Sequence, residues 1–192
     1  MERKTFLCRY QVSIDERGEP LALGRTASSV TLKAEDTFSG EPVAVQIVRP
    51  GPLEQVPLDK LAADARAAQQ LDHINIARTR DFGSDGSDVV YVREFLEGST
   101  LDAWVAEHGP LPVAAVMRIA LQSVNALAAA AFQSLTHRAL QPSNLMIVPG
   151  QTPEGEWPLV KILNFGAMAP TFPRTGFTTT GPGDLMQFAS PE

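Results

Sequence analysis

The chain is 192 residues long, with 44% hydrophobic and 20% charged residues, which suits one globular domain or two small lobes. A formal net charge of −6 argues against a nucleic-acid partner, because phosphate backbones are bound by clustered Lys and Arg. The single cysteine, Cys8, excludes an internal disulfide and favours a reducing compartment.

The first half of the chain is predicted to be rich in β-strands. Apolar runs with many β-branched residues predict strands within 10–48, separated by turns that contain Gly and Pro. The period changes at 57–71, where Leu and Ala recur at helical spacing and predict one helix. Strands are predicted again at 74–82 and 89–95, on either side of the polar turn GSDGSD.

The second half is predicted to be mainly helical. Ser99 or Thr100 can cap a short helix that ends at Gly109-Pro110. A long apolar helix follows at 112–135. Two short strands are predicted after it, at 145–148 and 159–163, and a long loop from 166 onward.

The most apolar segment, 113–132, is long enough to cross a bilayer. Arg118, Gln122 and Asn125 interrupt it, which favours a helix buried in protein. The first residues, MERKTF, lack the apolar run of a signal peptide. The sequence therefore predicts a soluble, cytoplasmic protein without membrane contact.

Seven motifs occur in the order and at the spacings of the protein kinase fold. LGRTASSVTLKA resembles the glycine-rich loop, VAVQ the strand with the phosphate-binding Lys, and ADARAAQQLDHINI the helix C region. YVREFLEG resembles the hinge, HRALQPSN the catalytic loop, ILNFG the metal-binding turn and FASPE the end of the activation segment. The chain is thus similar to bacterial serine/threonine protein kinases over nearly its whole length. The resemblance implies an α+β fold, with a β-rich N-lobe with one helix C at 1–95 and a truncated, mainly helical C-lobe at 96–192.

The resemblance also implies that the catalytic positions are degenerate. These positions are Gln46, Asp64, Ala139, Gln141, Asn144 and Asn164. Gln46 and Gln141 stand where the family has Lys, and Asp64 stands for the helix Glu that pairs with the strand Lys. Ala139 cannot accept the substrate proton, a role worth roughly 10²–10⁴ in rate, and Asn164 offers a neutral oxygen where Mg²⁺ prefers a carboxylate. The retained Asn144 is either a metal ligand or an amide that ties the loop together.

The nucleotide pocket is represented by Gly24, Ala44, Arg93, Glu94 and Met146. Thr26 and Ser29 replace two glycines of the glycine-rich loop, so an ordinary β-turn is favoured over a phosphate cradle. Ala34 and Ala44 are expected as small residues above the adenine space.

Arg93 falls at the gatekeeper position, at the back of the adenine site. A guanidinium there cannot stay buried alone, so we expect it to pair with Asp64 and to obstruct ATP. A register error of one residue would instead turn Arg93 outward to water.

These substitutions favour an inactive kinase-like domain, a pseudokinase, that acts as a regulatory or protein-binding module without a metal and with little or no ATP binding. The alternative is weak nucleotide binding or residual phosphotransfer with atypical chemistry. Kinase-like proteins that transfer AMP keep the metal Asp and the phosphate Lys, which this chain lacks.

Three further features carry expectations. Asp81-Phe82-Gly83 spells the family's metal-binding triplet but lies upstream of the catalytic loop, so an ordinary strand is expected there. Thr175, Thr178, Thr179 and Thr180 form a possible modification segment, which Arg138 could contact once it is phosphorylated; a solvated loop is equally compatible. The apolar helix 113–132 would need a protein partner, or a further part of a longer chain, to cover it.

Overall fold

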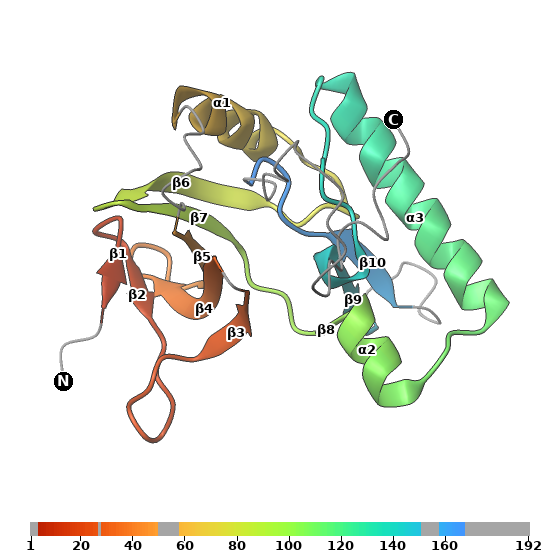
Figure 1. Cartoon of the computed structure of the whole chain (residues 1–192), viewed down its shortest axis with the longest axis horizontal. Helices are drawn as coiled ribbons and strands as arrows, with labels where there is room; N and C mark the ends of the chain where they lie inside the picture. The colour runs from red at the N-terminus through yellow and green to blue at the C-terminus, as the bar shows by residue number, and fades with distance from the viewer. Residues whose placement is uncertain (1–3, 27, 50–57, 151–157, 168–192) are drawn as a thin grey trace, which may run out of the picture. The chain divides into compact units, whose positions relative to one another are not determined.

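A computed structural model describes residues 4–26, 28–49, 58–150 and 158–167 (Figure 1). The chain forms two compact units, which are described separately. Unit 1 comprises Met1–Asp72 and Ala77–Leu96, and unit 2 comprises His73–Ile76 and Glu97–Glu192. The predicted α+β class, with strands dominating the first half and helices the second, is confirmed.

Unit 1 is built on an antiparallel sheet, which has seven strands in the described part of the chain. The strands are β1 (Thr5–Phe6), β2 (Tyr10–Val12), β3 (Ala22–Arg25), β4 (Ser29–Asp36), β5 (Pro42–Val48), β6 (Thr79–Asp85) and β7 (Asp88–Glu94). Their order is β1-β2-β4-β5-β7-β6, and β3 pairs with β4 outside this path.

The two faces of this sheet differ in chemistry because side chains alternate along each strand. One face carries a buried apolar cluster in which Val43 and Val45 of β5 meet Val90 and Val92 of β7. The opposite face carries Ala44 and Gln46 of β5, with Tyr91 and Arg93 of β7 as their cross-strand partners. The side chains of Gln46 and Arg93 therefore lie on the face away from that cluster, whereas Glu94, which pairs with Val43, lies on the face of the cluster.

The helix α1 (Leu58–Gln69) of unit 1 lies along β6 (Figure 1). Leu61, Ala65 and Ala68 are buried at the helical spacing seen in the sequence, so the predicted helix is confirmed. At its end, Gln69 Nε2 donates to the Arg80 carbonyl of β6 at 3.1 Å.

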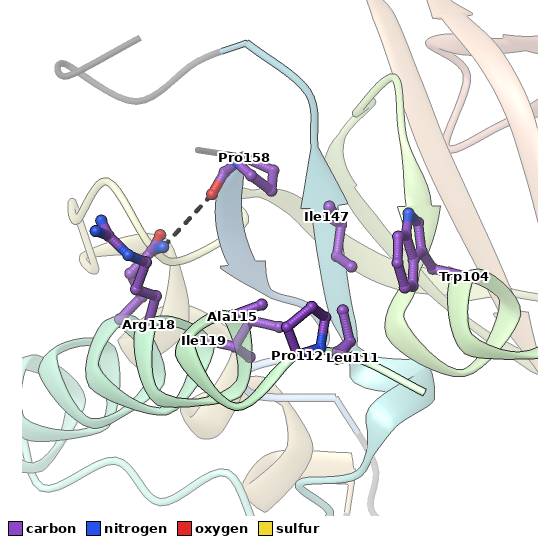
Figure 2. A pocket seen from close by; sticks show the side chains of 9 residues that line it. Trp104, Leu111, Pro112, Ala115, Arg118, Ile119, Ile147 and Pro158 are labelled. Atoms are coloured by element: carbon purple, nitrogen blue, oxygen red, sulfur yellow. Dashed lines mark hydrogen bonds between the residues drawn. The ribbon is translucent and has the colours of Figure 1, made fainter. Parts of the chain in front are cut away.

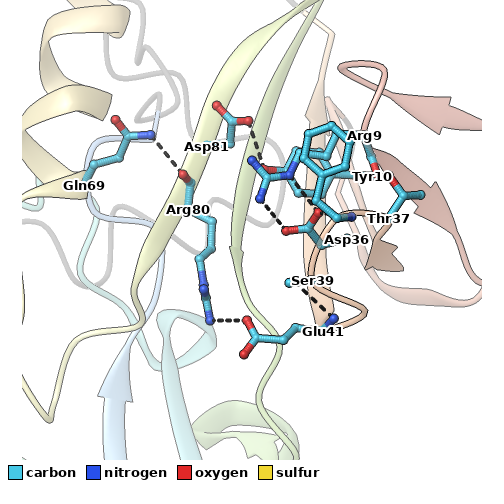
Figure 3. Close-up of polar contacts among 10 residues, drawn as sticks. Arg9, Tyr10, Asp36, Thr37, Ser39, Glu41, Gln69, Arg80 and Asp81 are labelled. Atoms are coloured by element: carbon cyan, nitrogen blue, oxygen red, sulfur yellow. Dashed lines mark hydrogen bonds and ion pairs between the residues drawn. The ribbon is translucent and has the colours of Figure 1, made fainter.

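A polar network ties the first strands of unit 1 to the rest of the sheet (Figure 3). Arg9 donates from Nε to Asp36 Oδ1 at 2.7 Å and from a terminal nitrogen to Asp36 Oδ2 at 2.6 Å. These charge-assisted bonds hold the pKa of Asp36 well below its usual range. Tyr10 donates its hydroxyl to Asp81 Oδ2 at 2.9 Å, and burial raises the pKa of Tyr10.

The first residues of the predicted strand 74–82 do not form a strand. Ile76 is buried and bridges to Ile162 within unit 2, and the backbone carbonyl of Asn75 accepts from Ile162 N at 2.8 Å. β6 begins only at Thr79 and runs on to Asp85, where Gly86 at φ 62° makes the turn to β7. Ile74 and Ile76, which look like the start of a strand of unit 1, thus belong to unit 2.

Unit 2 combines helices with a small antiparallel sheet of order β10-β9-β8. The elements are β8 (Ser99–Thr100), α2 (Leu101–His108), α3 (Val113–Phe132), the 3₁₀ turn η1 (Pro142–Asn144), β9 (Leu145–Val148) and β10 (Leu159–Ile162). Thr100 is the N-cap residue of α2 but makes no side-chain capping bond, and Gly109 ends the helix at φ 86°.

The long helix α3 is less covered than its sequence predicts. Ser123, Ala126 and Ala130 are its buried residues, whereas Met117 and Leu121 are 65% and 63% exposed. The prediction of a helix buried in protein is therefore wrong for most of its surface. By length and composition alone α3 could cross a bilayer, which is a weak indication, and no membrane span is positively indicated.

Candidate functional site

The loop between β3 and β4 in unit 1 is closed by hydroxyl groups. Thr26 Oγ1 lies 2.8 Å from Ser29 Oγ and accepts from Ser29 N at 3.0 Å, and Thr26 N donates to the Ser29 carbonyl at 2.9 Å. Gly24 is exposed, and an added Cβ there would meet no atom within 4 Å. The two residues that replace glycines therefore brace the loop, while the fold itself does not require Gly24.

Gln46 and Arg93 are neighbours on the polar face of the sheet. Ala44 pairs with Arg93 and Gln46 pairs with Tyr91, so Gln46 and Arg93 are diagonal partners on adjacent strands. Ala34 lies in the apolar cluster on the other face and pairs with Val43, so the expectation that it lies above the adenine space together with Ala44 is wrong.

Arg93 is held by few contacts. Its side chain is partly buried, and a terminal nitrogen donates to the Glu94 carbonyl at 3.5 Å, the outer limit of a hydrogen bond. Arg93 Nε and Gln46 Oε1 are both inaccessible to solvent and have no hydrogen-bond partner among the described residues. Burial lowers the pKa of Arg93 to about 10, against the opposing charge of Glu94, so the guanidinium remains a cation at neutral pH.

The predicted ion pair between Arg93 and Asp64 is not formed. Among the ion pairs of the described residues, none joins these two side chains. Asp64 is partly exposed on α1. The prediction was wrong because it assigned the guanidinium to the nearest acid available in the motif, whereas a terminal nitrogen of Arg93 is turned to the backbone carbonyl of Glu94, the next residue on the same strand.

The triplet Asp81-Phe82-Gly83 serves the fold of unit 1, as predicted. Asp81 accepts the Tyr10 hydroxyl, and the Phe82 ring lies 4.9 Å from the Tyr91 ring. These contacts give Asp81 and Phe82 a structural role within unit 1.

The catalytic-loop motif in unit 2 is ordered by buried contacts. His137 Nε2 lies 2.7 Å from the Leu163 carbonyl, and its ring meets Phe165 edge-on at 4.9 Å. Burial lowers the pKa of His137, while the bond to Leu163 opposes this shift. His137 thus joins the catalytic-loop motif to Leu163 and Phe165 of the ILNFG motif.

Asn144 and Asn164 bind each other. Asn164 Nδ2 donates to Asn144 Oδ1 at 2.8 Å, and Asn144 Nδ2 donates to the Ala139 carbonyl at 2.7 Å. Asn164 has φ 65°, in the left-handed region where Asn is better tolerated than most residues. Of the two roles left open for Asn144, the structure shows the one in which its amide ties the loop together.

The side chains of Asn144 and Asn164 offer neutral amide oxygens as possible metal ligands. Within the described residues, no group of three or more His, Cys, Asp or Glu side chains is placed to hold a metal ion. Amide oxygens are weak Mg²⁺ ligands by themselves, so they suit an ion whose other ligands are phosphate oxygens and water. Gln141 is partly buried and accepts from Asn144 N through its carbonyl at 2.8 Å.

The remaining predicted site residues have contacts within their own units. Met146 lies on β9, paired with Lys161 and Thr100, and Glu94 Oε1 accepts from Arg78 N at 3.0 Å. Arg138 is exposed at φ 63°. The predicted modification sites lie outside the described residues: Thr175, Thr178, Thr179 and Thr180.

Sequence reasoning missed an amide pair in unit 2, in which Asn75 is buried and Gln122 is half-buried. Asn75 Nδ2 donates to Gln122 Oε1 and to the Val160 carbonyl, both at 2.8 Å, and Gln122 Oε1 also accepts from Val160 N at 2.8 Å. The available signal was Gln122, a polar residue within an apolar helix.

Unit 2 also holds an apolar pocket of about 260 Å³ (Figure 2). Trp104 lies at one side of it and Pro158 and Arg118 lie toward the other, with Ile147 of β9 between them. None of the predicted site residues lines this pocket.

Comparisons with known proteins agree on one family. The model of the protein kinase domain matches residues 20–192. The serine/threonine-protein kinase Pkn1 of Myxococcus xanthus is 33% identical over 146 residues, which are 75% of this chain and 20% of Pkn1. The probable kinase PknB of Lactococcus lactis is 28% identical over 92% of this chain and 26% of its own length. The chain thus spans about a fifth to a quarter of these relatives.

Solved structures show the same fold. The PknI kinase domain of Mycobacterium tuberculosis superposes with a TM-score of 0.73 at 19% identity, covering 88% of this chain and 64% of that one. Rad53 in complex with AMP-PNP has a TM-score of 0.65 at 27% identity, covering 82% of this chain and 38% of that one.

Two expectations are corrected by these comparisons. The expectation that the chain is not an enzyme is contradicted, because its relatives are named serine/threonine kinases, which points to an enzyme. The expectation that it uses no nucleotide or metal is contradicted as well, because kinase relatives and a neighbour that holds AMP-PNP point to their use. Both expectations gave the substitutions at single motif positions more weight than the similarity of the whole chain to the family.

The kinase-like fold inferred from short motifs is thus matched along nearly the whole chain, and this chain belongs to the protein kinase domain family.

Proposed function

We propose that the chain binds a nucleoside triphosphate and transfers its terminal phosphoryl group slowly to protein hydroxyl groups. The observation that carries this proposal is the ordered frame of the catalytic-loop motif, held by His137 and Asn144. Serine/threonine kinases among the relatives support a protein hydroxyl as acceptor.

The proposed chemistry relies on positioning more than on proton abstraction. Phosphoryl transfer passes through a loose transition state, so placing the reactants and neutralising charge contribute most of the rate. Ala139 supplies no base, which lowers the rate by roughly 10²–10⁴ but leaves the other contributions in place. Bound Mg²⁺ would neutralise phosphate charge, with the amide oxygens of Asn144 and Asn164 as its protein ligands.

Restoring the family base tests this proposal. We expect Ala139→Asp to raise transfer of label from radiolabelled ATP by about 10²–10⁴-fold, and Asn144→Ala to remove it. Substitution of the exposed residue Glu16 to Ala is the matched control and should leave the rate unchanged. Heat-inactivated protein gives the background. Absence of transfer from both the unmodified chain and Ala139→Asp, while ATP still binds, would contradict the proposed transfer.

A second function, regulation through binding of another protein, is favoured by the exposed face of α3. Exposed apolar side chains recur every three to four residues along α3 and form a stripe. The stripe consists of Val113, Met117, with Val116 beside it, Leu121 and Val124. We propose that an amphipathic helix of a partner protein covers this stripe, since that spacing suits helix-on-helix burial.

Sedimentation velocity and binding of an apolar fluorescent dye test this stripe. The isolated chain should bind the dye and associate as its concentration rises, and Leu121→Lys should reduce both effects. A monomeric chain that does not bind the dye would contradict the proposal.

The exposed free Cys8 suits a reducing compartment, and we propose the cytoplasm as the location.

A further inference from the structure

The apolar pocket of about 260 Å³ in unit 2 has no part in the functions proposed above (Figure 2). Ala115 and Ile119 of α3 and Ile147 of β9 are among the side chains that line it. A dry apolar cavity of roughly 150 Å³ in a protein core binds benzene. The larger pocket of unit 2 therefore has room for two fused rings.

The pocket and the exposed apolar stripe lie on opposite sides of α3. Ala115, Ile119 and Gln122 line the pocket and are three or four residues apart, which places them on one face of the helix. At about 3.6 residues per turn, Met117 and Leu121 of the stripe fall on the opposite face. A partner helix that covers the stripe therefore leaves the pocket open to a different ligand.

Gln122 turns a hydrogen-bond donor toward the pocket. Its Oε1 accepts from Asn75 Nδ2 and from Val160 N, both at 2.8 Å. A backbone N–H can only donate, so the amide oxygen has to face Val160 and the amide nitrogen lies on the other side. There Nε2 donates to the Pro158 carbonyl at 3.5 Å, the outer limit of a hydrogen bond (Figure 2). The amide nitrogen therefore has capacity for a stronger acceptor.

Two further side chains set the chemistry of the pocket. Trp104 stacks on His108 of the same helix, with ring centroids 4.6 Å apart and 15° between the planes, which holds an aromatic wall at one side. Arg118 lies toward the other side, one helical turn before Gln122, and is exposed, so its charge stays at the rim. Trp, Arg and an amide nitrogen all donate, and no carboxylate is among the described residues that line the pocket.

We infer that this pocket binds a small aromatic carboxylate. The apolar lining buries the ring beside Trp104, while the carboxylate accepts from Gln122 Nε2 and pairs with Arg118 at the rim. A carboxylate only accepts hydrogen bonds, which matches side chains that donate. Its position at the rim keeps the carboxylate in contact with water, which limits the cost of desolvation. The inference is independent of nucleotide binding and adds a ligand of another chemical class.

Protein NMR with 2-naphthoate as the probe tests the inference. The probe has two fused rings and a carboxylate, and a ligand of this size is expected to bind with a dissociation constant of about 0.1–1 mM. The indole N–H signal of Trp104, identified by its loss in Trp104→Phe, should shift as naphthoate is added. Ala115→Phe places a ring inside the pocket and should abolish the shift, while an unchanged or higher melting temperature shows that this variant is folded.

A neutral analogue isolates the contribution of the charge. 2-Naphthamide has the same rings and an uncharged polar group, and it should bind the unmodified chain about 3- to 10-fold more weakly than naphthoate. In Arg118→Met, which keeps the stem of the side chain and removes the charge, the two probes should bind equally. Arg17→Met removes the same charge from an exposed turn of unit 1 and is the matched control, so it should keep the preference for naphthoate.

Three outcomes overturn the inference. The first is the absence of a Trp104 shift at naphthoate concentrations well above the expected dissociation constant, or a shift that persists in Ala115→Phe. The second is an unchanged preference for naphthoate in Arg118→Met, which shows that Arg118 does not bind the carboxylate. The third is tighter binding of octanoate, a linear carboxylate, which assigns the pocket to aliphatic chains. Failure of the unmodified chain to bind nucleotides overturns the proposed function and leaves this inference standing.

Discussion

Asn75→Ala should destabilise unit 2 strongly, although Asn75 belongs to no helix or strand. Its side chain is buried at 5% exposure and donates two hydrogen bonds, to Gln122 on α3 and to the Val160 carbonyl on β10. Truncation leaves the Val160 carbonyl without this partner in a buried site, a penalty of about 1–3 kcal/mol. Loss of the second bond adds about 0.5–1.5 kcal/mol.

The expected loss is therefore about 2–4 kcal/mol in the free energy of unfolding. Urea unfolding followed by circular dichroism measures it, and Ile74→Ala, at a neighbouring position that is 52% exposed, is the matched control. The control should stay within about 0.5 kcal/mol of the unmodified chain. A loss in Asn75→Ala no larger than that of the control would refute the reasoning.

A double-mutant cycle isolates the contact between the two amides. Gln122→Ala removes the acceptor of Asn75 and also the partner of Val160 N. Since the three groups form one network, the combined variant should lose less than the sum of the single losses, with a coupling of about 0.5–3 kcal/mol. Strict additivity would show that Asn75 and Gln122 act independently.

Three further predictions concern single positions. Gly98→Ala should destabilise unit 2 by about 1–3 kcal/mol, because a Cβ there overlaps a backbone carbonyl of β9, whereas Gly24→Ala has open space and should be nearly neutral; urea unfolding compares the two. Arg9 depresses the pKa of Asp36 in the folded state, so the ion pair stabilises the fold above pH ~4 and this stabilisation is lost as the pH falls. Asp36→Asn should therefore cost stability at pH 7 and progressively less below pH ~4. An equal cost at both pH values would count against the ion pair. The pKa of His137 is lowered by burial, so stability should fall as the pH drops below ~6.5; His137→Gln, which keeps a donor but does not titrate, should flatten that part of the profile measured by thermal unfolding.

The sequence by itself determined the order of elements and the family. Helical spacing predicted α1, a long apolar run predicted α3, and motif order indicated a kinase-like fold that the family model matches over 20–192. These features are local, because periodicity and turn residues act over a few positions. The sequence also identified Gln46, Ala139 and Asn164 as the residues at degenerate catalytic positions, since each lies at a fixed place in a short motif.

Only the tertiary structure decided which side chains meet. Sequence reasoning paired Arg93 with Asp64, whereas the folded sheet turns a terminal nitrogen of Arg93 to the Glu94 carbonyl and leaves Arg93 Nε without a hydrogen-bond partner among the described residues. Asn75 and Gln122 are 47 residues apart, and no local pattern predicts that they share a hydrogen bond. Register and long-range burial emerge only when the whole sheet and its helices have assembled, because a shift of one residue turns a side chain to the opposite face.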